Sequence, residues 1–232
     1  MKRLVPSLRK RWAELHDPDR FRLVHRAGLT FLVNYNAWAD RQVVIHGLEE
    51  RPQIEYLFTR IRGRACTMFL DIGAHMCIYA ALAASRHLCG RVIAFEPDPR
   101  NYVRLCTQLL LNDLLDVVET HEAAVSNTDG TVSFAQGEYD VWSHVGAGDL
   151  NVRALRLDTL LSPVAESIAI KMDIEGHELT ALAGMTRLLN ANDCFLQIES
   201  FADNLPALIT TMRSLGYTHL NTIAHDHYFA RD

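Results

Sequence analysis

Apolar residues come in short continuous runs from residue 67 onward, and polar or amphipathic stretches separate these runs. A run of about six residues has the length of a strand and is too short for a buried helix. Continuous apolar positions, without alternation, are typical of parallel strands that are covered on both faces. We therefore predict strands over residues 67–72, 91–96, 116–121, 167–172, 194–199, 217–223 and 227–231.

The stretches between the runs predict helices, over residues 76–87, 179–189 and 204–214. Gly216 suits the end of the last of these, and another helix opens at Asp98, a favourable N-cap, with Pro99 in its first turn. About three residues join the last two strands, too few for a parallel crossover, so those strands run antiparallel. The pattern predicts an α/β, Rossmann-like fold with a mainly parallel seven-stranded sheet and an antiparallel C-terminal strand pair.

The first 64 residues precede this pattern and predict a separate elaboration. Residues 21–25 and 29–35 can pair as a hairpin that turns at Gly28, and a helix follows Pro52. We expect residues 1–64 to hold a basic arm, this hairpin and this helix.

The main domain is expected over residues 65–232. Within it, residues 126–150 are polar and contain the turn signals Asn127, Asp129 and Gly130. They predict a hairpin or a long loop in place of a regular crossover helix.

Composition indicates a soluble globular protein. The chain has 232 residues, 49% of them hydrophobic and 22% charged, which excludes disordered and fibrous classes. Its net charge of −5 disfavours nucleic acid as a partner. Residues 1–26 nevertheless carry eight Lys or Arg against three acids. This basic arm could contact an anionic surface or carrier, although a solvated helix face is the simpler interpretation.

The cysteines and the longest apolar run bear on the compartment. Five cysteines without a C-x-x-C pair indicate neither a disulfide framework nor a zinc site. The apolar run over residues 65–84 is interrupted by Asp71 and His75, so we expect no membrane span. A cytoplasmic location fits these features best.

Ligands of open parallel sheets bind beyond the carboxyl ends of the strands, and the first strand ends in a candidate cofactor loop. Gly73 follows Asp71 and can form a tight turn, and the next helix offers free N–H groups. His75 and Ile78 stand where a dinucleotide fingerprint needs glycines, and the chain lacks a Walker motif. S-adenosylmethionine has no phosphate, so one glycine with an adjacent acid is enough for it.

The second strand ends at Glu96, ahead of Pro97 and Asp98. A carboxylate at this place can accept hydrogen bonds from both ribose hydroxyls of a nucleoside. Dinucleotide-binding proteins share such an acid, and it could instead cap the next helix. The missing glycines after Gly73 are what favour S-adenosylmethionine over NAD or FAD.

The fourth predicted strand leads into a charged segment, residues 170–178. Strand alternation would direct Lys171, Asp173 and Glu175 to one side. Lys171 is the only lysine after Lys10, so a titratable amine or a compact charge could be required there. A lysine that simply pairs with a neighbouring carboxylate is an equally good interpretation.

Taken in order, these motifs resemble the FkbM family of S-adenosylmethionine-dependent O-methyltransferases. The resemblance covers most of the chain from about residue 28 to residue 200, and Phe-Glu-Pro followed by Lys-x-Asp-x-Glu-Gly is its most specific part. It rests on residues 71–74, 92–98, 111–112, 124–126, 157–160 and 170–176. It implies a Rossmann-like class I methyltransferase fold.

The resemblance also implies a set of cofactor residues and an acceptor. The expected cofactor residues are Asp71, Gly73, Ala74, His75, Glu96, Pro97, Asp98 and Ala123. The expected acceptor is a hydroxyl of a sugar, a glycan or a secondary metabolite. Two positions depart from the family pattern, because His75 replaces the usual Asn and Cys77 replaces a second Gly. The cofactor turn is therefore bulkier, and we expect Cys77 to pack without abolishing binding.

Methyl transfer needs an oriented acceptor whose proton is removed as charge develops. Asp173 is the first candidate for the base and Glu175 the second, with Lys171 beside them and His144 or His177 as substitutes.

A magnesium site formed by Asp173 with Asp203 and Asn204 is the alternative to catalysis without a metal. A role of Asp203 or Asn204 in capping the next helix is the better interpretation, so no metal is expected. Residues 225–227 (His-Asp-His) are interpreted as a polar turn away from the site.

The segment around Tyr139, Trp142 and Ser143 could contact the acceptor through its aromatic faces, although packing explains Trp142 equally well. Two other functional classes stay open: a catalytically silent partner subunit with a cofactor fold, and a nucleotide-dependent oxidoreductase.

Overall fold

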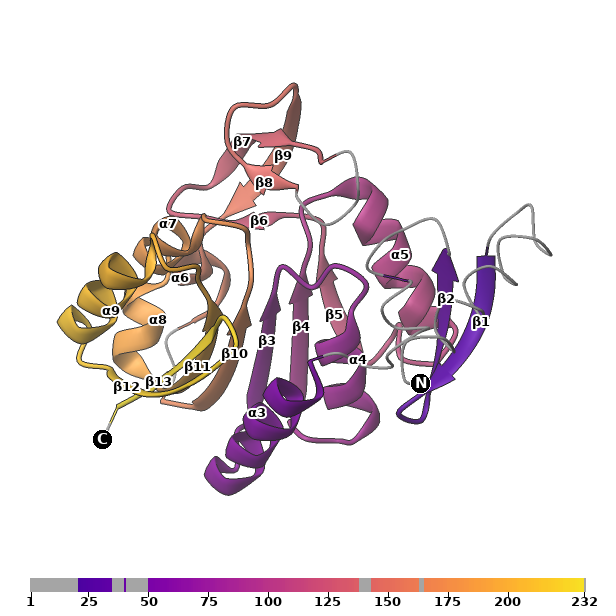
Figure 1. Cartoon of the computed structure of the whole chain (residues 1–232), viewed down its shortest axis with the longest axis horizontal. Coiled ribbons are helices and arrows are strands. Elements are labelled where there is room, and N and C mark those ends of the chain that lie inside the picture. The colour runs from indigo at the N-terminus through magenta and orange to yellow at the C-terminus, as the bar shows by residue number, and fades with distance from the viewer. Residues whose placement is uncertain (1–20, 35–39, 41–49, 138–142, 163–164, 232) are drawn as a thin grey trace, which may run out of the picture.

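A computed structural model describes residues 21–34, 40, 50–137, 143–162 and 165–231. Its centre is a seven-stranded sheet with the order β12-β13-β11-β10-β3-β4-β5 (Figure 1). The five strands from β11 to β5 are parallel neighbours, whereas β13 is antiparallel to both β11 and β12. The predicted sheet with its antiparallel C-terminal pair is therefore confirmed.

The strands lie within one or two residues of the predicted runs. They are β3 (Met68–Ile72), β4 (Arg91–Phe95), β5 (Val118–His121), β10 (Ser167–Met172), β11 (Asp193–Glu199), β12 (Thr218–Ile223) and β13 (Asp226–Ala230). All five residues of β3 and of β13 are buried, and so are the last five of β10. Burial on both faces explains why these runs show no alternation.

Helices cover both faces of the sheet and give two buried clusters. One cluster joins the sheet to α3 (Arg51–Arg64), α4 (Ile78–Ser85) and α5 (Pro99–Leu110). The other joins it to α6 (Leu157–Leu160), α7 (Glu178–Ala183), α8 (Thr186–Ala191) and α9 (Leu205–Ser214). The strand order reverses at β3, because β4 lies on one side of β3 and β10 on the other. In open sheets of this kind, ligands bind beyond the carboxyl ends of the strands at such a reversal.

The single helix predicted over residues 179–189 is wrong, because two short helices take its place. A Cβ on Gly184 would lie 1.9 Å from the carbonyl oxygen of Ser126, so the main chain at Gly184 packs closely against the main chain at Ser126. Asp158 then accepts hydrogen bonds from the N–H groups of Arg187 and Leu188, at 3.0 and 2.8 Å, and caps the start of α8. Ser126 and Asp158, the two residues that cause the break, both lie far from it in the sequence.

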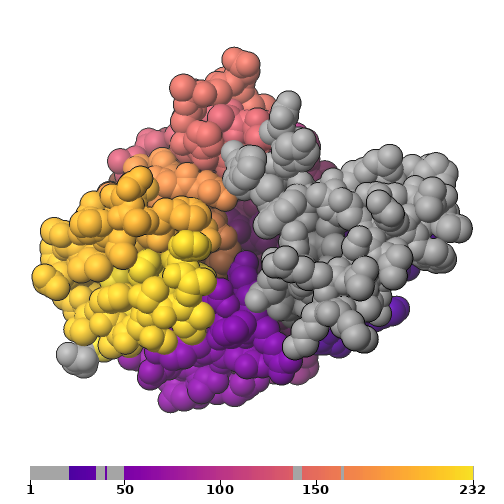
Figure 2. Space-filling view, in the orientation of Figure 1, coloured from indigo at the N-terminus to yellow at the C-terminus, as the bar shows by residue number. Residues whose placement is uncertain are grey.

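The region expected as a hairpin or loop forms a second sheet. Its four strands are β6 (Ala124–Val125), β7 (Gly130–Ala135), β8 (His144–Val145) and β9 (Leu150–Leu155), in the order β6-β9-β7-β8. A part of this sheet projects from the body of the molecule at the top of Figure 2. The carboxyl ends of β3 and β4 point toward it (Figure 1).

The predicted N-terminal hairpin and helix are both present. Strands β1 (Phe21–Arg26) and β2 (Leu29–Asn34) pair around Ala27 and Gly28, which have the positive φ angles of 51° and 88° that a tight hairpin turn requires. Gln108 of α5 and Asn112, just after this helix, exchange hydrogen bonds with the main chain of β2. Most of the basic arm, residues 1–20, lies outside the described residues, and the domain boundary after residue 64 stays a prediction.

All five cysteines are free thiols. None of the helices that the structure describes combines the length and the hydropathy needed to cross a lipid bilayer.

Candidate active site

Polar side chains from four neighbouring strands form a row near the carboxyl edge of the sheet. Asp71 of β3 pairs in register with Lys171 of β10, Lys171 pairs with Gln197 of β11, and Gln197 pairs with Tyr228 of β13. Glu199, two residues after Gln197, and Asp226, two residues before Tyr228, are also paired in register. Because residues i and i+2 of a strand share a face, the second row continues the first toward the strand ends.

Lys171 is the centre of this arrangement. Its ammonium nitrogen lies 3.2 Å from Oδ2 of Asp173, 3.4 Å from the carbonyl oxygen of Gly73 and 5.3 Å from the ring centre of Tyr79. Burial alone would lower the pKa of Lys171, but the carboxyl groups of Asp173 and Asp71 outweigh burial and raise it. Lys171 therefore stays protonated, which favours the compact charge over the titratable amine.

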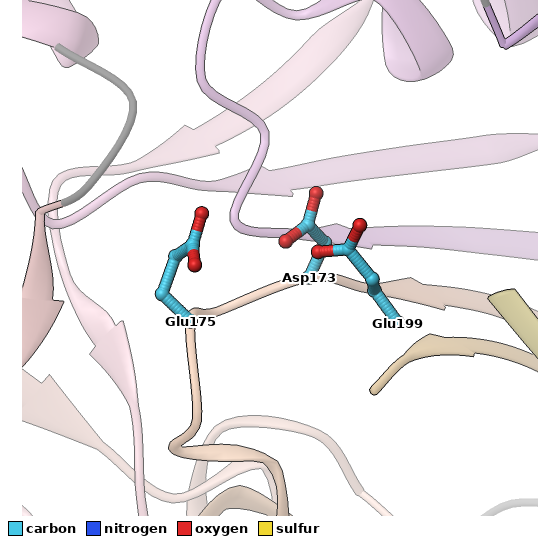
Figure 3. Close-up of side chains that lie close together, drawn as sticks. All are labelled: Asp173, Glu175 and Glu199. Atoms are coloured by element: carbon cyan, nitrogen blue, oxygen red, sulfur yellow. The ribbon is translucent and has the colours of Figure 1, made fainter. Parts of the chain in front are cut away.

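Asp173, Glu175 and Glu199 bring their carboxyl oxygens within 4.8 Å of one another (Figure 3). Asp173 and Glu175 follow β10, and Glu199 ends β11. Burial and the adjacent Asp173 carboxylate raise the pKa of Glu199 to about 9. Although burial opposes it, the charge of Lys171 and the hydrogen bond from Glu199 hold the pKa of Asp173 below its usual value. Glu199 thus stays protonated, and its O–H group donates a hydrogen bond to an ionised Asp173.

Glu175 differs from its two neighbours in exposure and in backbone conformation. The residue is exposed, and its φ angle of 53° is in the left-handed region, which is uncommon for a side chain other than glycine. Partial burial of the carboxyl group, together with the charges of Asp173 and Glu178, raises the pKa of Glu175 to about 7. Glu175 is therefore better suited than Asp173 to accept a proton near neutral pH.

Residues 225–227 are only in part the polar turn predicted from the sequence. Ala224 and His225 make the turn, but Asp226 and His227 are buried in β13. Asp226 accepts a hydrogen bond of 2.8 Å from Nε2 of Gln197 and helps to raise the pKa of Lys171. The expectation that this segment lies away from the site is wrong, because antiparallel pairing returns β13 to the carboxyl edge of β11.

The predicted cofactor turn follows β3. Gly73 has a φ angle of 80°, and a Cβ at this position would lie 1.9 Å from the carbonyl oxygen of Asp173. The N–H groups of Gly73 and Ala74 both donate to the carbonyl oxygen of Phe95, at 3.0 and 2.9 Å. Only glycine fits here, because the turn packs directly against the segment that carries Asp173.

Glu96 joins this turn to the end of β4. It is buried, and its two oxygens accept hydrogen bonds from the N–H groups of His75 (2.8 Å) and Asp98 (2.9 Å). Burial outweighs these bonds and raises the pKa of Glu96 to about 7. Each carboxylate oxygen has two lone pairs, so the group can still accept from a ligand diol.

Asp98 is the N-cap of α5, as predicted, and accepts a 2.9 Å hydrogen bond from the N–H of Arg100. Its second oxygen binds the Arg100 guanidinium at 2.8 Å and the Ser143 hydroxyl at 3.0 Å. Pro97 lies between the two acids, and Ala123 is fully buried just beyond β5. The structure thus shows a helix cap at Asp98, and the role of Asp98, Pro97 and Ala123 in cofactor binding stays a prediction.

Asp71 uses one carboxyl oxygen in the fold and has the other available for a ligand. Its Oδ2 accepts a 3.0 Å hydrogen bond from the N–H of Ala80 in α4, whereas Oδ1 is buried and has no partner among the described residues. Burial raises the pKa of Asp71 despite the charge of Lys171. A buried acceptor without a partner is costly, and a bound donor group would satisfy it.

The two departures from the family pattern both adopt left-handed backbone conformations. His75 has a φ angle of 49° and Cys77 one of 65°, values that the Asn and Gly usual in the family adopt more easily. The Cys77 side chain is fully buried in the cluster beneath α4, so it packs, as expected. His75 is partly buried, and it lies near enough to Asp173 to lower the pKa of that carboxyl group, although burial and Lys171 act more strongly on it.

The remaining candidates lie outside the carboxyl cluster. His144 is exposed on β8, in the smaller sheet, and His177 contacts the Ser126 hydroxyl at 3.1 Å. Tyr139 and Trp142 lie outside the described residues. Asn204 occupies the N-cap of α9 but makes no capping hydrogen bond with its side chain, and Asp203 is exposed. The grouped oxygen ligands in the described chain are Asp173, Glu175 and Glu199, not the predicted set with Asp203 and Asn204.

Sequence analysis missed four residues of the site: Glu199, Asp226, Gln197 and Tyr79. Gln197 and Glu199 alternate along a predicted strand, and this period of two could have placed them on one face. Tyr79 lies in the first turn of α4, and its hydroxyl accepts a 3.1 Å hydrogen bond from Nε2 of Gln197. No local signal could have placed Asp226, because its position depends on the register of β13.

Comparison with known proteins identifies the family. Residues 71–218 match the model of the methyltransferase FkbM domain, and this match spans more than half of the chain. The chain belongs to this family. The match begins at Asp71 and includes Gly73, Glu96, the Lys171–Glu175 segment and Glu199, whereas Asp226 and Tyr228 lie beyond its end. Most of the site described above therefore lies inside the methyltransferase FkbM domain.

Three known proteins illustrate what the chain is similar to. The chain is 29% identical over 152 residues to the hexuronic acid methyltransferase AglP of Haloferax volcanii, covering 62% of this chain and 58% of that protein. A S-adenosylmethionine-dependent methyltransferase from Agrobacterium tumefaciens has a TM-score of 0.56 at 9% identity, covering 94% of this chain and 71% of the other. A methyltransferase FkbM from Methylobacillus flagellatus has a TM-score of 0.49 at 21% identity, covering 71% and 43%. The fold is that of class I methyltransferases.

Proposed function

We propose that this FkbM domain transfers a methyl group from S-adenosylmethionine to a hydroxyl oxygen of a sugar, a glycan or a secondary metabolite. One observation carries the proposal: the turn at Gly73, which Glu96 binds through the N–H of His75, packs directly against Asp173. Lys171 and Glu175 lie in the same segment as Asp173. A nucleoside-binding feature and a cluster of acid–base groups thus share one edge of the sheet.

The residues fit the cofactor in three respects. The lone pairs of Glu96 that remain free can accept hydrogen bonds from the two ribose hydroxyls, and Gly73, with its φ angle of 80°, forms the tight turn that would face the aminoacyl part. The free oxygen of Asp71 can accept from the ammonium group. When bound, S-adenosylmethionine supplies a methyl group on a positively charged sulfur.

The charge of the site also suits a cationic donor. Asp173, Asp71, Glu50 and Asp226 all act on Lys171 strongly enough to raise its pKa against the effect of burial. An excess of negative charge in a partly buried site attracts a sulfonium ion and holds the neutral thioether product less strongly. The same charge would therefore favour release of the product.

In this proposal, Glu175 removes the proton of the acceptor hydroxyl group. Its pKa of about 7, set by partial burial and by Asp173, lets it take the hydroxyl proton as the oxygen is methylated. Asp173, which is ionised and held by Lys171, orients the acceptor by accepting a hydrogen bond from a second, neighbouring hydroxyl group of the acceptor. This assignment reverses the order predicted from the sequence, where Asp173 came first.

One relative supports a class of acceptor. The relative from Haloferax volcanii is named for a hexuronic acid, a sugar derivative, which supports a carbohydrate acceptor for this chain. This chain spans 58% of that relative, so the acceptor of the present chain is part of the proposal.

Calorimetric titration with S-adenosylmethionine, S-adenosylhomocysteine and NADH tests the cofactor. The expected result is binding of the first two and not of NADH. Binding of NADH alone would support the oxidoreductase, and binding of none would support the silent partner subunit.

Two variants then separate cofactor binding from chemistry. Glu96→Ala should weaken S-adenosylmethionine binding about 10- to 100-fold, because a buried carboxylate acceptor is lost. Asp173→Asn should leave the cofactor Kd near its original value and lower kcat on a sugar acceptor about 100-fold. The assignment fails if Asp173→Asn keeps full turnover on an acceptor that the unmodified protein methylates.

A further inference from the structure

Glu175 is held in an unfavourable backbone conformation next to the proposed acceptor position. Its φ angle of 53° is left-handed, and Gly176 follows with a φ angle of 96°. A left-handed conformation costs free energy for a residue with a Cβ, so neighbouring contacts must maintain it. The contacts around residues 173–178 show which groups do so.

Glu178 supplies the main contacts at the end of this segment. Its Oε1 accepts a hydrogen bond of 3.0 Å from the N–H of Gly176 and one of 3.4 Å from the N–H of Ile174. These two N–H groups flank Glu175 on either side. Glu178 is 6% exposed, and burial raises the pKa of its carboxyl group. A buried carboxyl group is thus committed to the main chain around Glu175.

The start of the segment is fixed independently. The N–H of Asp173 donates to the carbonyl oxygen of Ile72 at 3.0 Å, and the carbonyl oxygen of Asp173 packs against Gly73 at a distance that leaves no room for a Cβ. With Asp173 held by β3, and with Ile174 and Gly176 held by Glu178, the backbone of Glu175 is restrained on both sides.

We propose that Glu178 is a positioning residue that maintains the left-handed conformation of Glu175 and so holds the Glu175 carboxyl group beside Asp173 and Glu199. The inference rests on the proposed function, in which Glu175 takes the acceptor proton. Without the two hydrogen bonds to Glu178, the segment would relax, and the Glu175 carboxyl group would leave the cluster shown in Figure 3.

The test compares two substitutions of Glu178. Glu178→Ala removes the acceptor and should lower kcat about 100-fold, the cost of misplacing a reacting group by about 1 Å. The Kd for S-adenosylmethionine should stay within about twofold, because the hydrogen bonds of Glu178 go to Ile174 and Gly176 and not to Gly73 or Glu96. Glu178→Gln keeps an oxygen for both N–H groups and should restore kcat to within about tenfold of the original value.

Asp158 provides a matched control. It is also a buried carboxylate that accepts two main-chain N–H groups, those of Arg187 and Leu188, but it braces α8 and lies outside the proposed machinery. Asp158→Ala should lower the melting temperature as Glu178→Ala does and leave kcat unchanged. Equal losses of kcat in the two alanine variants would overturn the proposal, because they would show a general effect of stability.

A measurement on the ligand-free protein separates this inference from the proposed function. Amide hydrogen exchange at Gly176 should speed up at least about tenfold in Glu178→Ala, return in Glu178→Gln, and stay unchanged in Asp158→Ala. Unchanged exchange in Glu178→Ala would overturn the inference whatever the enzyme does. Faster exchange with no turnover in the unmodified protein would instead count against the proposed function alone.

Discussion

The two sides of the site use their carboxyl groups in different ways. On the side of β3 and β4, the acids accept hydrogen bonds from main-chain N–H groups: Glu96 from His75 and Asp98, and Asp71 from Ala80. On the side of β10 and β11, Asp173, Glu175 and Glu199 bring their carboxyl oxygens within 4.8 Å of one another, and Lys171 binds Asp173. Glu178 is the exception on this side, because it accepts from main-chain N–H groups. The same residue types thus meet two different sets of partners.

This difference distinguishes acids that shape the backbone from acids that remain available for chemistry. A carboxylate bound to main-chain N–H groups fixes the loop around it, so the side of β3 and β4 can recognise a ligand by its shape. Carboxyl groups that crowd together shift one another's pKa values, which leaves protons poised to move. Four variants or conditions test the distinction, beginning with the largest expected effect.

Lys171→Met should produce the largest loss of stability. It removes a buried ammonium group and leaves the carboxylates of Asp173, Asp71 and Asp226 without their shared cation. The free energy of unfolding should fall by about 3–5 kcal/mol at pH 8, as measured by urea titration. The loss should shrink at pH 6, because protonation relieves the repulsion. An unchanged stability at pH 8 would refute the central role of Lys171.

Gly73→Ala tests the contact between the two sides. The added Cβ would overlap the carbonyl oxygen of Asp173, so we expect a loss of about 3 kcal/mol. Gly28→Ala is the matched control, since Gly28 has a similar φ angle of 88° but no atom within 4 Å of the added Cβ. It should cost only about 1 kcal/mol, the strain of the left-handed conformation. Equal losses in thermal unfolding would mean that the two sides do not touch at Gly73.

The pH dependence of turnover tests the side of β10 and β11. The pKa of Glu175 is raised to about 7 by partial burial and by Asp173, so kcat at saturating cofactor should fall as the pH drops through 7 and Glu175 binds a proton. The slope should approach about tenfold per pH unit below pH 7. A kcat that stays constant from pH 8 to pH 5.5 would exclude Glu175 as the base.

Asp98→Asn should have the smallest effect. Asparagine is also a good N-cap, and the ion pair with Arg100 is partly exposed, so the free energy of unfolding should fall by less than about 1 kcal/mol. The Kd for S-adenosylmethionine should not change if Asp98 serves the backbone only. A tenfold weaker affinity would instead support the cofactor role predicted from the sequence.

Sequence analysis predicted much of the fold because the main signals are local. The apolar runs that became β3, β4, β10 and β11 are buried on both faces, and a strand of this kind leaves a continuous hydrophobic signature. The cap at Asp98 and the hairpin turn at Gly28 also depend on residues close in sequence. Such features can be inferred without knowledge of the rest of the chain.

The features that sequence analysis missed depend on distant contacts. The break between α7 and α8 arises where Gly184 meets Ser126, and β6 and β8 have two residues each, so only their pairing partners make them strands. Asp226 reached the site because β13 lies between β12 and β11. Asp173 and Glu175 were predicted as acid–base candidates beside Lys171. The order of their proton affinities also depends on burial and on the hydrogen bond from Glu199 to Asp173, and Glu199 lies on another strand.

The row from Asp71 through Lys171 and Gln197 to Tyr228 also limits how this sequence can change by evolution or engineering. Its members face the same side only because each strand contributes every second residue. Deleting or inserting one amino acid within β10 would turn Lys171 and Asp173 toward the opposite helical layer and bring Ile170 or Met172 into their places. The segment can therefore diverge by replacement but hardly by a change of length.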